Sequence, residues 1–280
     1  SDTVRFDGSI KRYSINKIEQ TEVQAFWDAN FSTDVAASLT YNPNQSYFLV
    51  TDQSPVFSNG ATLLTNVDKI EFEGDTVWLN TSVEQSEISW LDPYSGSQVR
   101  VEGTQFNDTI IAADIMSSQV AKDFWNIEFN GHRGDDVFIG DDMGSSIRDG
   151  AGNDLIVGAG SPILENDRWF GQDQVNFSGV KARYQIELIG GGDVVIDSEN
   201  NTIFDLTKLT DGEITTADGT VHQVGSGYNK AYVVKDLLPA EFEGQGINLL
   251  LGVERINFSD TGINLESEVY ENTWADPSDP

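Results

Sequence analysis

Short runs of alternating apolar and polar residues recur along this chain, and clusters of glycine, aspartate and asparagine separate them. Alternation with a period of two is typical of half-buried strands, so the pattern predicts an all-β chain. Two stretches depart from it. Residues 16–30 and 114–125 place apolar side chains three or four positions apart, as a helix does. We therefore expect one or two short helices in insertions between the strands.

The strand-forming blocks occur twice, in the same order. The segment DTVRFDG at residues 2–8 matches DQVNFSG at 173–179, RYSI at 12–15 matches RYQI at 183–186, VTD at 50–52 resembles VID at 195–197, and VDKIEF at 67–72 matches VERINF at 253–258. Because the order is kept and only the spacers differ, we expect two homologous strand-rich modules. The alignment of Asp2 with Asp173 further predicts that the chain begins inside a turn and is a fragment of a longer protein.

A nine-residue frame, G-G-x-G-x-D-x-U-x with U a large apolar residue, repeats between these blocks. Residues 131–139 and 149–157 fit it, whereas residues 140–148 keep the apolar position but carry Ser145 in place of the aspartate. Residues 103–111 fit with Phe106 replacing a glycine, and residues 171–175 resume the second half of the frame. The glycines allow a tight turn, and x-U-x forms a short strand whose apolar residue points inward.

Two nines complete one coil, so residues about 18 positions apart should stack on the same edge. This spacing predicts that Asp136, Asp154 and Asp173 form one column, with a cation between successive turns. The other edge, through Ser145 and Ile163, lacks the aspartate and should hold no regular ion. Oxygen donors of this kind suit Ca²⁺ far better than zinc or copper. The candidate calcium-binding residues are Gly131, Arg133, Asp149 and Ala151 through turn carbonyls, and Asp108, Asp135, Asp136, Asp154 and Asp173, with Asp141 and Asp142 as an irregular site.

The charge balance also favours a cation. Sixteen lysines and arginines face 46 aspartates and glutamates, which gives a formal net charge of -30. Repulsion of this size destabilises a compact state unless counter-ions are bound, and it disfavours nucleic acid and anionic membranes as partners. The chain has no cysteine, which excludes disulfides and thiolate metal sites. No apolar run is long enough to suggest membrane insertion.

The nonapeptides resemble the RTX, or haemolysin-type, calcium-binding repeats of secreted bacterial proteins, over residues 101 to about 179. The resemblance implies a parallel β-roll with calcium between stacked turns, and secretion or display on the bacterial cell surface through a type I system. We therefore expect a short calcium β-roll at residues 101–176, flanked by strand modules at 1–100 and 177–267, with an acidic tail or linker at 268–280.

The expected function is that of a calcium-dependent, non-catalytic module of a large secreted RTX protein such as an adhesin. The alternative is a structural, folding or secretion domain of an exported RTX enzyme or toxin. The sequence contains none of the common hydrolase, metalloprotease or phosphate-loop motifs. Neighbouring domains of the same chain are expected partners, as is a glycan or peptide on a cell surface. Four aromatic residues in spacers could bind such a ligand or simply pack: Trp90, Tyr94, Trp125 and Trp169.

Overall fold

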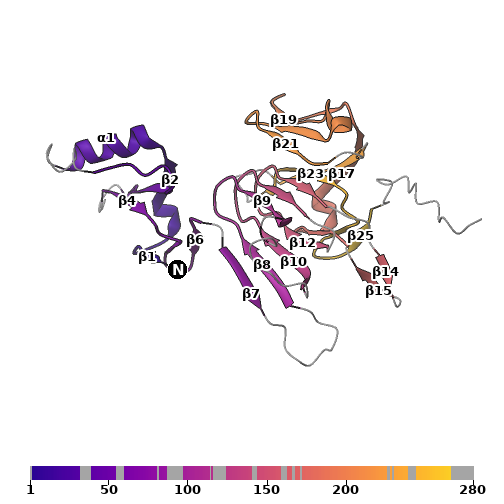
Figure 1. Cartoon of the computed structure of the whole chain (residues 1–280), viewed down its shortest axis with the longest axis horizontal. Coiled ribbons are helices and arrows are strands. Elements are labelled where there is room, and N and C mark those ends of the chain that lie inside the picture. Colours follow the sequence, from indigo (N-terminus) through magenta and orange to yellow (C-terminus); the bar gives the residue numbers. More distant parts are fainter. Residues whose placement is uncertain are drawn as a thin grey trace, which may run out of the picture. The chain divides into compact units, whose positions relative to one another are not determined.

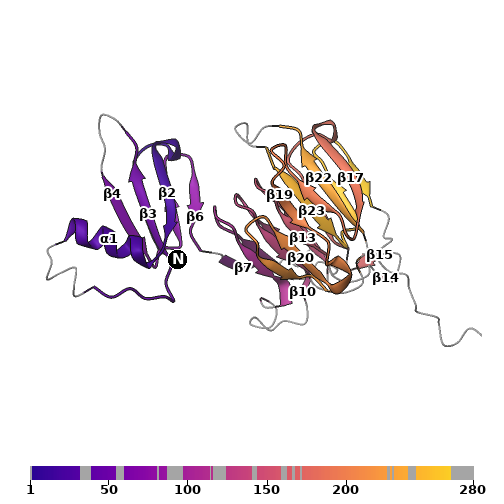
Figure 2. The same cartoon turned by 90° about the horizontal axis from the view of Figure 1, so that it is seen from above.

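The computed structural model (Figures 1 and 2) describes residues 2–31, 39–54, 60–80, 82–86, 97–113, 115, 124–140, 144–158, 163–165, 168–170, 172–225, 228, 230–238 and 244–265. The chain divides into two compact units, residues 1–81 and 82–280. Strands dominate both units, and α1 (Gln20–Asn30) is the one α-helix with described bounds, so the expected all-β class is confirmed. The expected tail at 268–280 lies outside the described residues.

The first unit consists of two small sheets and the helix. Its elements are β1 (Thr3–Arg5), a 3-10 turn η1 (Ile10–Arg12), β2 (Tyr13–Ile18), α1 (Gln20–Asn30), β3 (Tyr47–Asp52), β4 (Ala61–Thr65), β5 (Lys69–Glu71) and β6 (Thr76–Trp78). One sheet has the order β1-β5-β6, and the other has the order β2-β3-β4. The first pair, β1 and β5, is parallel, whereas the other pairs are antiparallel.

Helix α1 confirms the helix predicted within residues 16–30, although it begins only at Gln20. The residues before it continue strand β2, which ends at Ile18. Val23 and Trp27 are the buried residues of the helix, and they pack against Ile18 and Tyr47. Most of the second predicted helix, at residues 114–125, lies outside the described residues. Ile115 is helical, as are Ala112 and Ala113 before it, whereas the last two predicted positions begin strand β10.

The second unit is built on two long sheets. Its elements are β7 (Ser82–Ser86), β8 (Ser97–Glu102), β9 (Thr109–Ile111), β10 (Phe124–Asn130), β11 (Val137–Ile139), β12 (Ser145–Arg148), β13 (Leu155–Val157), β14 (Ile163–Glu165), β15 (Arg168–Phe170), β16 (Gln174–Asn176), η2 (Lys181–Arg183), β17 (Tyr184–Gly190), β18 (Val194–Ile196), β19 (Thr202–Asp205), η3 (Leu209–Asp211), β20 (Glu213–Thr216), β21 (Val221–Gln223), β22 (Lys230–Asp236), β23 (Ile247–Leu251), β24 (Arg255–Asn257) and β25 (Gly262–Asn264). The seven-stranded sheet has the order β25-β24-β16-β12-β10-β8-β7, and the six-stranded sheet has the order β17-β22-β23-β13-β11-β9.

From β8 to β13 the chain alternates between these two sheets, and the central strands of both are parallel. The apolar residues of the nonapeptide frame point between the sheets, where Phe138, Ile147 and Ile156 are fully buried in one core. Val137, Leu155 and Val157 face the other side of the six-stranded sheet, yet they are buried too. A four-stranded meander, β18 to β21, covers them with residues such as Phe204 and Leu206 (Figure 2). Parallel sheets covered on both faces have strands of this nearly all-apolar kind.

The coil repeats every 18 residues only where nothing is inserted. Phe129 pairs with Ile147, and Phe138 pairs with Ile156, at that spacing. Ile147, however, pairs with Val175, because the antiparallel hairpin β14–β15 lengthens the connection. The expectation that Ile163 occupies the next coil position is therefore wrong. Ile163 lies in the hairpin, and Val175 takes the coil position.

The second strand module continues both sheets of the coil. Strand β23 pairs in parallel with β13, and β24 pairs in parallel with β16. These ladders place residues 177–265 in the same compact unit as the nonapeptides, and residues 82–100 belong to that unit as well. The unit boundary at residue 81 therefore falls earlier than residue 100, where the duplication alone had placed the end of the first module.

The two modules share one design in three dimensions. Phe6, Tyr13 and Phe72 have ring centroids 5.3, 5.8 and 5.2 Å apart, and their counterparts Phe177, Tyr184 and Phe258 are 5.0, 5.7 and 5.1 Å apart. Each module also has one arginine–aspartate pair, with two hydrogen bonds, beside these rings: Arg12–Asp52 in the first and Arg183–Asp236 in the second.

The register corrects one match made from the sequence. Tyr13 lies opposite Asp52, and Tyr184 lies opposite Asp236, so Asp236 is the true counterpart of Asp52. The sequence match of VTD with VID aligns Asp52 with Asp197 instead. That residue lies in a surface turn, where its carboxylate accepts a hydrogen bond from the Asn201 side chain. The meander inserted between β17 and β22 displaced the true match further along the chain.

Candidate metal centre

Four stacked side chains form a ladder along one edge of the coil. The backbone N–H of Asp108 donates to Asp136 Oδ1 over 2.9 Å, and that of Asp136 donates to Asp154 Oδ1 over 2.9 Å. The N–H of Asp154 then donates to Asn248 Oδ1 over 2.8 Å. Asp136, Asp154 and Asn248 thus each use one oxygen to hold the turn before them. The ladder contains two of the three aspartates that we expected in one column, together with Asp108.

Asp173 lies on the opposite edge, and its predicted place in the column was wrong. Asp173 Oδ1 accepts from the Ser145 N–H over 2.7 Å, and the Asp173 N–H donates to Glu254 Oε2 over 2.7 Å. The residue follows the β14–β15 hairpin and enters the seven-stranded sheet, not the six-stranded one. The edge that was expected to lack an aspartate therefore carries one, next to Ser145.

The second carboxylate oxygens differ along the ladder. Asp108 Oδ2 accepts from Thr104, from the N–H over 2.6 Å and from the hydroxyl over 2.9 Å. Asp136 Oδ2 and Asp154 Oδ2 are buried and receive no hydrogen bond from the part of the chain that the structure describes. Buried carboxylates almost always have donors or a bound cation, because an uncompensated charge in the interior is costly. The two interior rungs of the ladder therefore have one acceptor each to spare.

Gly131 lies close to one of these oxygens and to a backbone carbonyl oxygen. A Cβ on Gly131 would lie 2.2 Å from the Asp149 carbonyl oxygen and 2.5 Å from Asp136 Oδ2. No side chain fits there, which gives a physical reason for glycine at this point of the frame. The same distances place a backbone carbonyl oxygen from one turn and a carboxylate oxygen from its neighbour on the same side of Gly131.

The pKa values of Asp136 and Asp154 are raised, as expected for buried carboxyl groups without a neighbouring positive charge. Burial raises the pKa of Asp136 to about 9, and the nearby charges of Asp108, Asp135 and Asp149 add to the rise. Burial also raises the pKa of Asp154, and the charges of Asp149 and Asp136 act in the same direction. Desolvation and like charges both oppose ionisation, so these acids cannot all be charged in the folded chain unless a cation is near.

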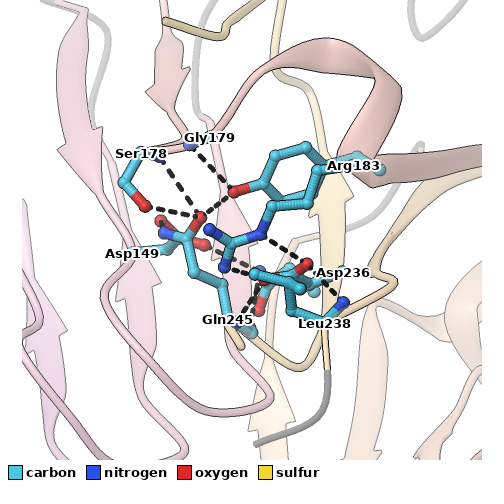
Figure 3. Close-up of polar contacts among 9 residues, drawn as sticks. Asp149, Ser178, Gly179, Arg183, Asp236, Leu238 and Gln245 are labelled. Atoms are coloured by element: carbon cyan, nitrogen blue, oxygen red, sulfur yellow. Dashed lines mark hydrogen bonds and ion pairs between the residues drawn. The ribbon is translucent and has the colours of Figure 1, made fainter. Parts of the chain in front are cut away.

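The carboxylate of Asp149 is already satisfied by amide donors (Figure 3). Gln245 Nε2 donates to Asp149 Oδ1 over 2.9 Å, and Asn248 Nδ2 donates to Asp149 Oδ2 over 2.7 Å. Gln245 Oε1 in turn accepts from the Ser178 N–H and from the Tyr184 hydroxyl. This network ties the second strand module to the turn, and it leaves the Asp149 carbonyl as the ligand candidate of that residue.

The remaining predicted ligands have other roles or lie elsewhere. Asp135 Oδ1 accepts from the Asn153 N–H in an outer ladder, over 2.8 Å. The Ala151 carbonyl accepts from the Gly134 N–H over 3.0 Å, and Arg133 forms an isolated parallel bridge with Ala151. Asp141 and Asp142 lie outside the described residues.

Sequence reasoning missed Asn248 and Glu254. Asn248 ends the ladder of Asp108, Asp136 and Asp154, and Glu254 accepts from the Asp173 N–H on the opposite edge. A signal was present: residues 244–248 read G-Q-G-I-N, which is the nonapeptide turn with asparagine in place of aspartate. Asparagine offers the same Oδ1 acceptor to the preceding turn, and its amide nitrogen supplies a donor that a carboxylate lacks. Requiring an aspartate hid the continuation of the coil.

The donor set fits a hard cation such as calcium. The spare atoms are carboxylate and carbonyl oxygens, without nitrogen or sulfur. Among the described residues no three histidine, cysteine, aspartate or glutamate side chains converge on one point, so a bound ion would depend on backbone oxygens as well. Asp136, Asp154 and the carbonyl of Asp149 are the groups that would hold it.

An open cleft of about 840 Å³ runs along the outside of the same turns, and its lining includes His132, Arg148 and Asn176. Its volume is in the range of small-ligand sites. Of the aromatic residues considered as ligand contacts, Trp90 and Tyr94 lie outside the described residues, as do the side chains of Trp125 and Trp169. A surface ligand therefore stays a prediction.

Comparison with known protein families, with curated proteins and with solved structures gives no match for this chain. None of the helices among the described residues has the length and apolar character needed to cross a membrane.

Proposed function

We propose that this chain is a calcium-dependent, non-catalytic folding module of a secreted bacterial protein of the RTX type. The observation that carries the proposal is the pair of buried carboxylate oxygens, on Asp136 and Asp154, that receive no hydrogen bond from any described residue. They lie in consecutive turns joined by the Asp136 N–H, so a single ladder gathers carboxyl groups inside the fold that ionise only when a cation is near.

The module's folding should depend on this charge. When bound, a calcium ion would supply the positive charge that the two carboxylates lack. Asp136 Oδ2 and the Asp149 carbonyl oxygen both lie close to Gly131, so one ion could contact both. Any ligand that binds the folded state and not the unfolded chain stabilises the fold, by about 2.7 kcal/mol at one hundred times its dissociation constant.

Location and partners follow from the same dependence. Weak oxygen-ligand sites fill at the roughly millimolar calcium found outside cells. A net charge of -30 would keep the chain expanded where calcium is scarce. We therefore place the module outside the cell or on its surface, next to other domains of one long chain. Calcium-dependent folding of this module is compatible with either candidate parent protein, an adhesin or an exported enzyme or toxin.

Thermal unfolding with and without calcium tests the proposal. We expect the transition of the second unit to rise by several degrees at millimolar calcium relative to EGTA, because binding adds a few kcal/mol to its stability. Magnesium at the same concentration controls for ionic screening, since Mg²⁺ gives up its water ligands reluctantly. Melting curves that coincide in calcium and in EGTA would refute the proposal.

A further inference from the structure

The first unit presents two strand edges that are occupied in the second module. In the second module, β16 pairs with coil strand β12, and β23 pairs with coil strand β13. Their counterparts in the first unit are β1 and β4. Both are edge strands of their sheets, and the part of the chain that the structure describes gives neither a second neighbour. Edge strands expose unpaired backbone N–H and C=O groups, which is a template for a further strand.

The residue before β1 makes the same hydrogen bond as the residue before β16. The Asp173 N–H donates to Glu254 Oε2 over 2.7 Å, and the Asp2 N–H donates to Asp68 Oδ2 over the same distance. In the second module the Asp173 carboxylate then accepts from the N–H of the coil residue Ser145. The Asp2 side chain occupies the same position but is exposed.

The corner before β4 has the conformation that a coil requires. Gly246 has a φ of +72°, and its Cβ would lie only 2.0 Å from the Gly152 carbonyl oxygen of the coil turn. Gly60, at the same point of the first unit, has a φ of +79°, and among the described residues its Cβ would meet no heavy atom within 4 Å. The first unit thus keeps a glycine turn suited to close approach.

Burial differs as expected if a layer is absent. Val175 is fully buried against the coil, whereas Val4 at the same position of β1 is half-buried. Asn248 is fully buried where it accepts from the coil, and its counterpart Thr62 in β4 is exposed. The hydroxyl of Thr62 can accept a hydrogen bond as Asn248 does.

We propose that β1 and β4 together receive a turn of a second Gly/Asp-rich parallel coil, as β16 and β23 receive residues 144–158. The partner is a nonapeptide-type turn whose two short strands extend both sheets of the first unit. Its backbone would pair with β1 and β4, and one turn N–H would donate to Asp2. Asn66 stands where Gly252 contacts the coil, so the partner would lie slightly farther away at that corner. The proposal rests on the duplication and not on calcium binding by this chain.

An extended chain tests the proposal. Residues 82–172 are copied in front of Asp2 in place of Ser1, so that Gln172 precedes Asp2 as it precedes Asp173 in the natural order. Hydrogen exchange is then compared with the unextended chain at millimolar calcium. Phe6 N–H donates to Glu71 in β5, so the alternate amides of Thr3 and Arg5 face the open edge. We expect these amides, and those on the open edge of β4, to exchange at least tenfold more slowly in the extended chain.

The control is the same extension without its last residue, which shifts the register by one position and turns the wrong face inward. Exchange in β16 and β23 is the internal reference. Unchanged exchange in β1 and β4 would overturn the proposal, and so would equal slowing with the shifted extension. Slowing in the unextended chain that grows with protein concentration would assign these edges to a second copy, and would also overturn it. The calcium proposal is read separately, from the melting of the unextended chain.

Discussion

Asp136→Asn replaces a buried ionisable carboxyl group with a neutral amide of nearly the same shape. The amide retains an oxygen to accept from the Asp108 N–H, which lies 2.9 Å from Asp136 Oδ1. In EGTA, burial raises the pKa of Asp136 to about 9, against about 3.9 in an unfolded chain. The folded chain therefore binds this proton more tightly, so the group favours folding below pH ~4 and loses that advantage as the pH rises toward 9.

The magnitude at pH 7 follows from that difference. Keeping the acid protonated across about three pH units costs roughly 4 kcal/mol, at 1.36 kcal/mol for each unit. The substitution removes this cost, so in EGTA the variant should be more stable than the natural chain by up to about 4 kcal/mol. Its stability should also vary less between pH 4 and pH 8. In calcium the stability difference between the variant and the natural chain should become smaller or change sign, because the variant lacks one carboxylate ligand.

Circular dichroism melts in EGTA and in millimolar calcium, at pH 5 and pH 7, measure both effects. Asp211→Asn is the matched control, because Asp211 is an exposed acid of the same unit. Its removal should change stability by no more than about 0.5 kcal/mol. If Asp136→Asn is less stable than the natural chain in EGTA, or keeps the full calcium response, the reasoning about the buried charge is refuted.

Two further variants test the packing of the turns and the link between the second module and the coil. Gly150→Ala should cost about 3 kcal/mol or more in urea unfolding, because Gly150 has a φ of +97° and its Cβ would lie 2.3 Å from the His132 carbonyl oxygen. Gly192→Ala, at a φ of +100° with no heavy atom within 4 Å, should cost only about 1–2 kcal/mol, and equal costs would contradict a steric role for the stacked turn. Asp236→Asn should lower stability by about 3 kcal/mol at pH 7, since it breaks the buried pair with Arg183. Burial opposes ionisation of Asp236, but hydrogen bonds from Arg183 and two amides leave its pKa lowered, so this stability is present above pH ~4 and lost as the pH falls further. The difference between variant and natural chain should shrink in urea unfolding at pH 3, and a constant difference would contradict the assignment.

The sequence predicted the strand class and the inward residues of the coil, because both follow from local periodicity. Phe138, Ile147 and Ile156 fall at the apolar position of successive nines, and all three are fully buried. The position of Asp173 could not be obtained in the same way. A count of residues carries no sign that a hairpin has been inserted, and the frame resumes on the other edge after it.

The polar ends of the ladders were hidden for a different reason. Asn248 and Glu254 perform the hydrogen-bonding task of the repeat aspartate with other side chains. Each accepts from a backbone N–H far away in the sequence, 94 residues before Asn248 and 81 residues before Glu254. A local sequence pattern cannot show such a long-range contact. The counterpart of Asp52 was likewise decided by strand register across a sheet and not by a three-residue match.

The inserts of the two modules enter at the same joint of the scaffold. Residues 19–46, with α1, separate β2 from β3, and residues 191–229, with the meander, separate the matching strands β17 and β22. Doubling the length of such a loop costs only about 0.6 kcal/mol of closure entropy. Loop closure therefore limits the length of an insert at this joint only weakly, whereas packing limits its sequence strongly, because an element grafted in place of the meander would have to cover Val137, Leu155 and Val157.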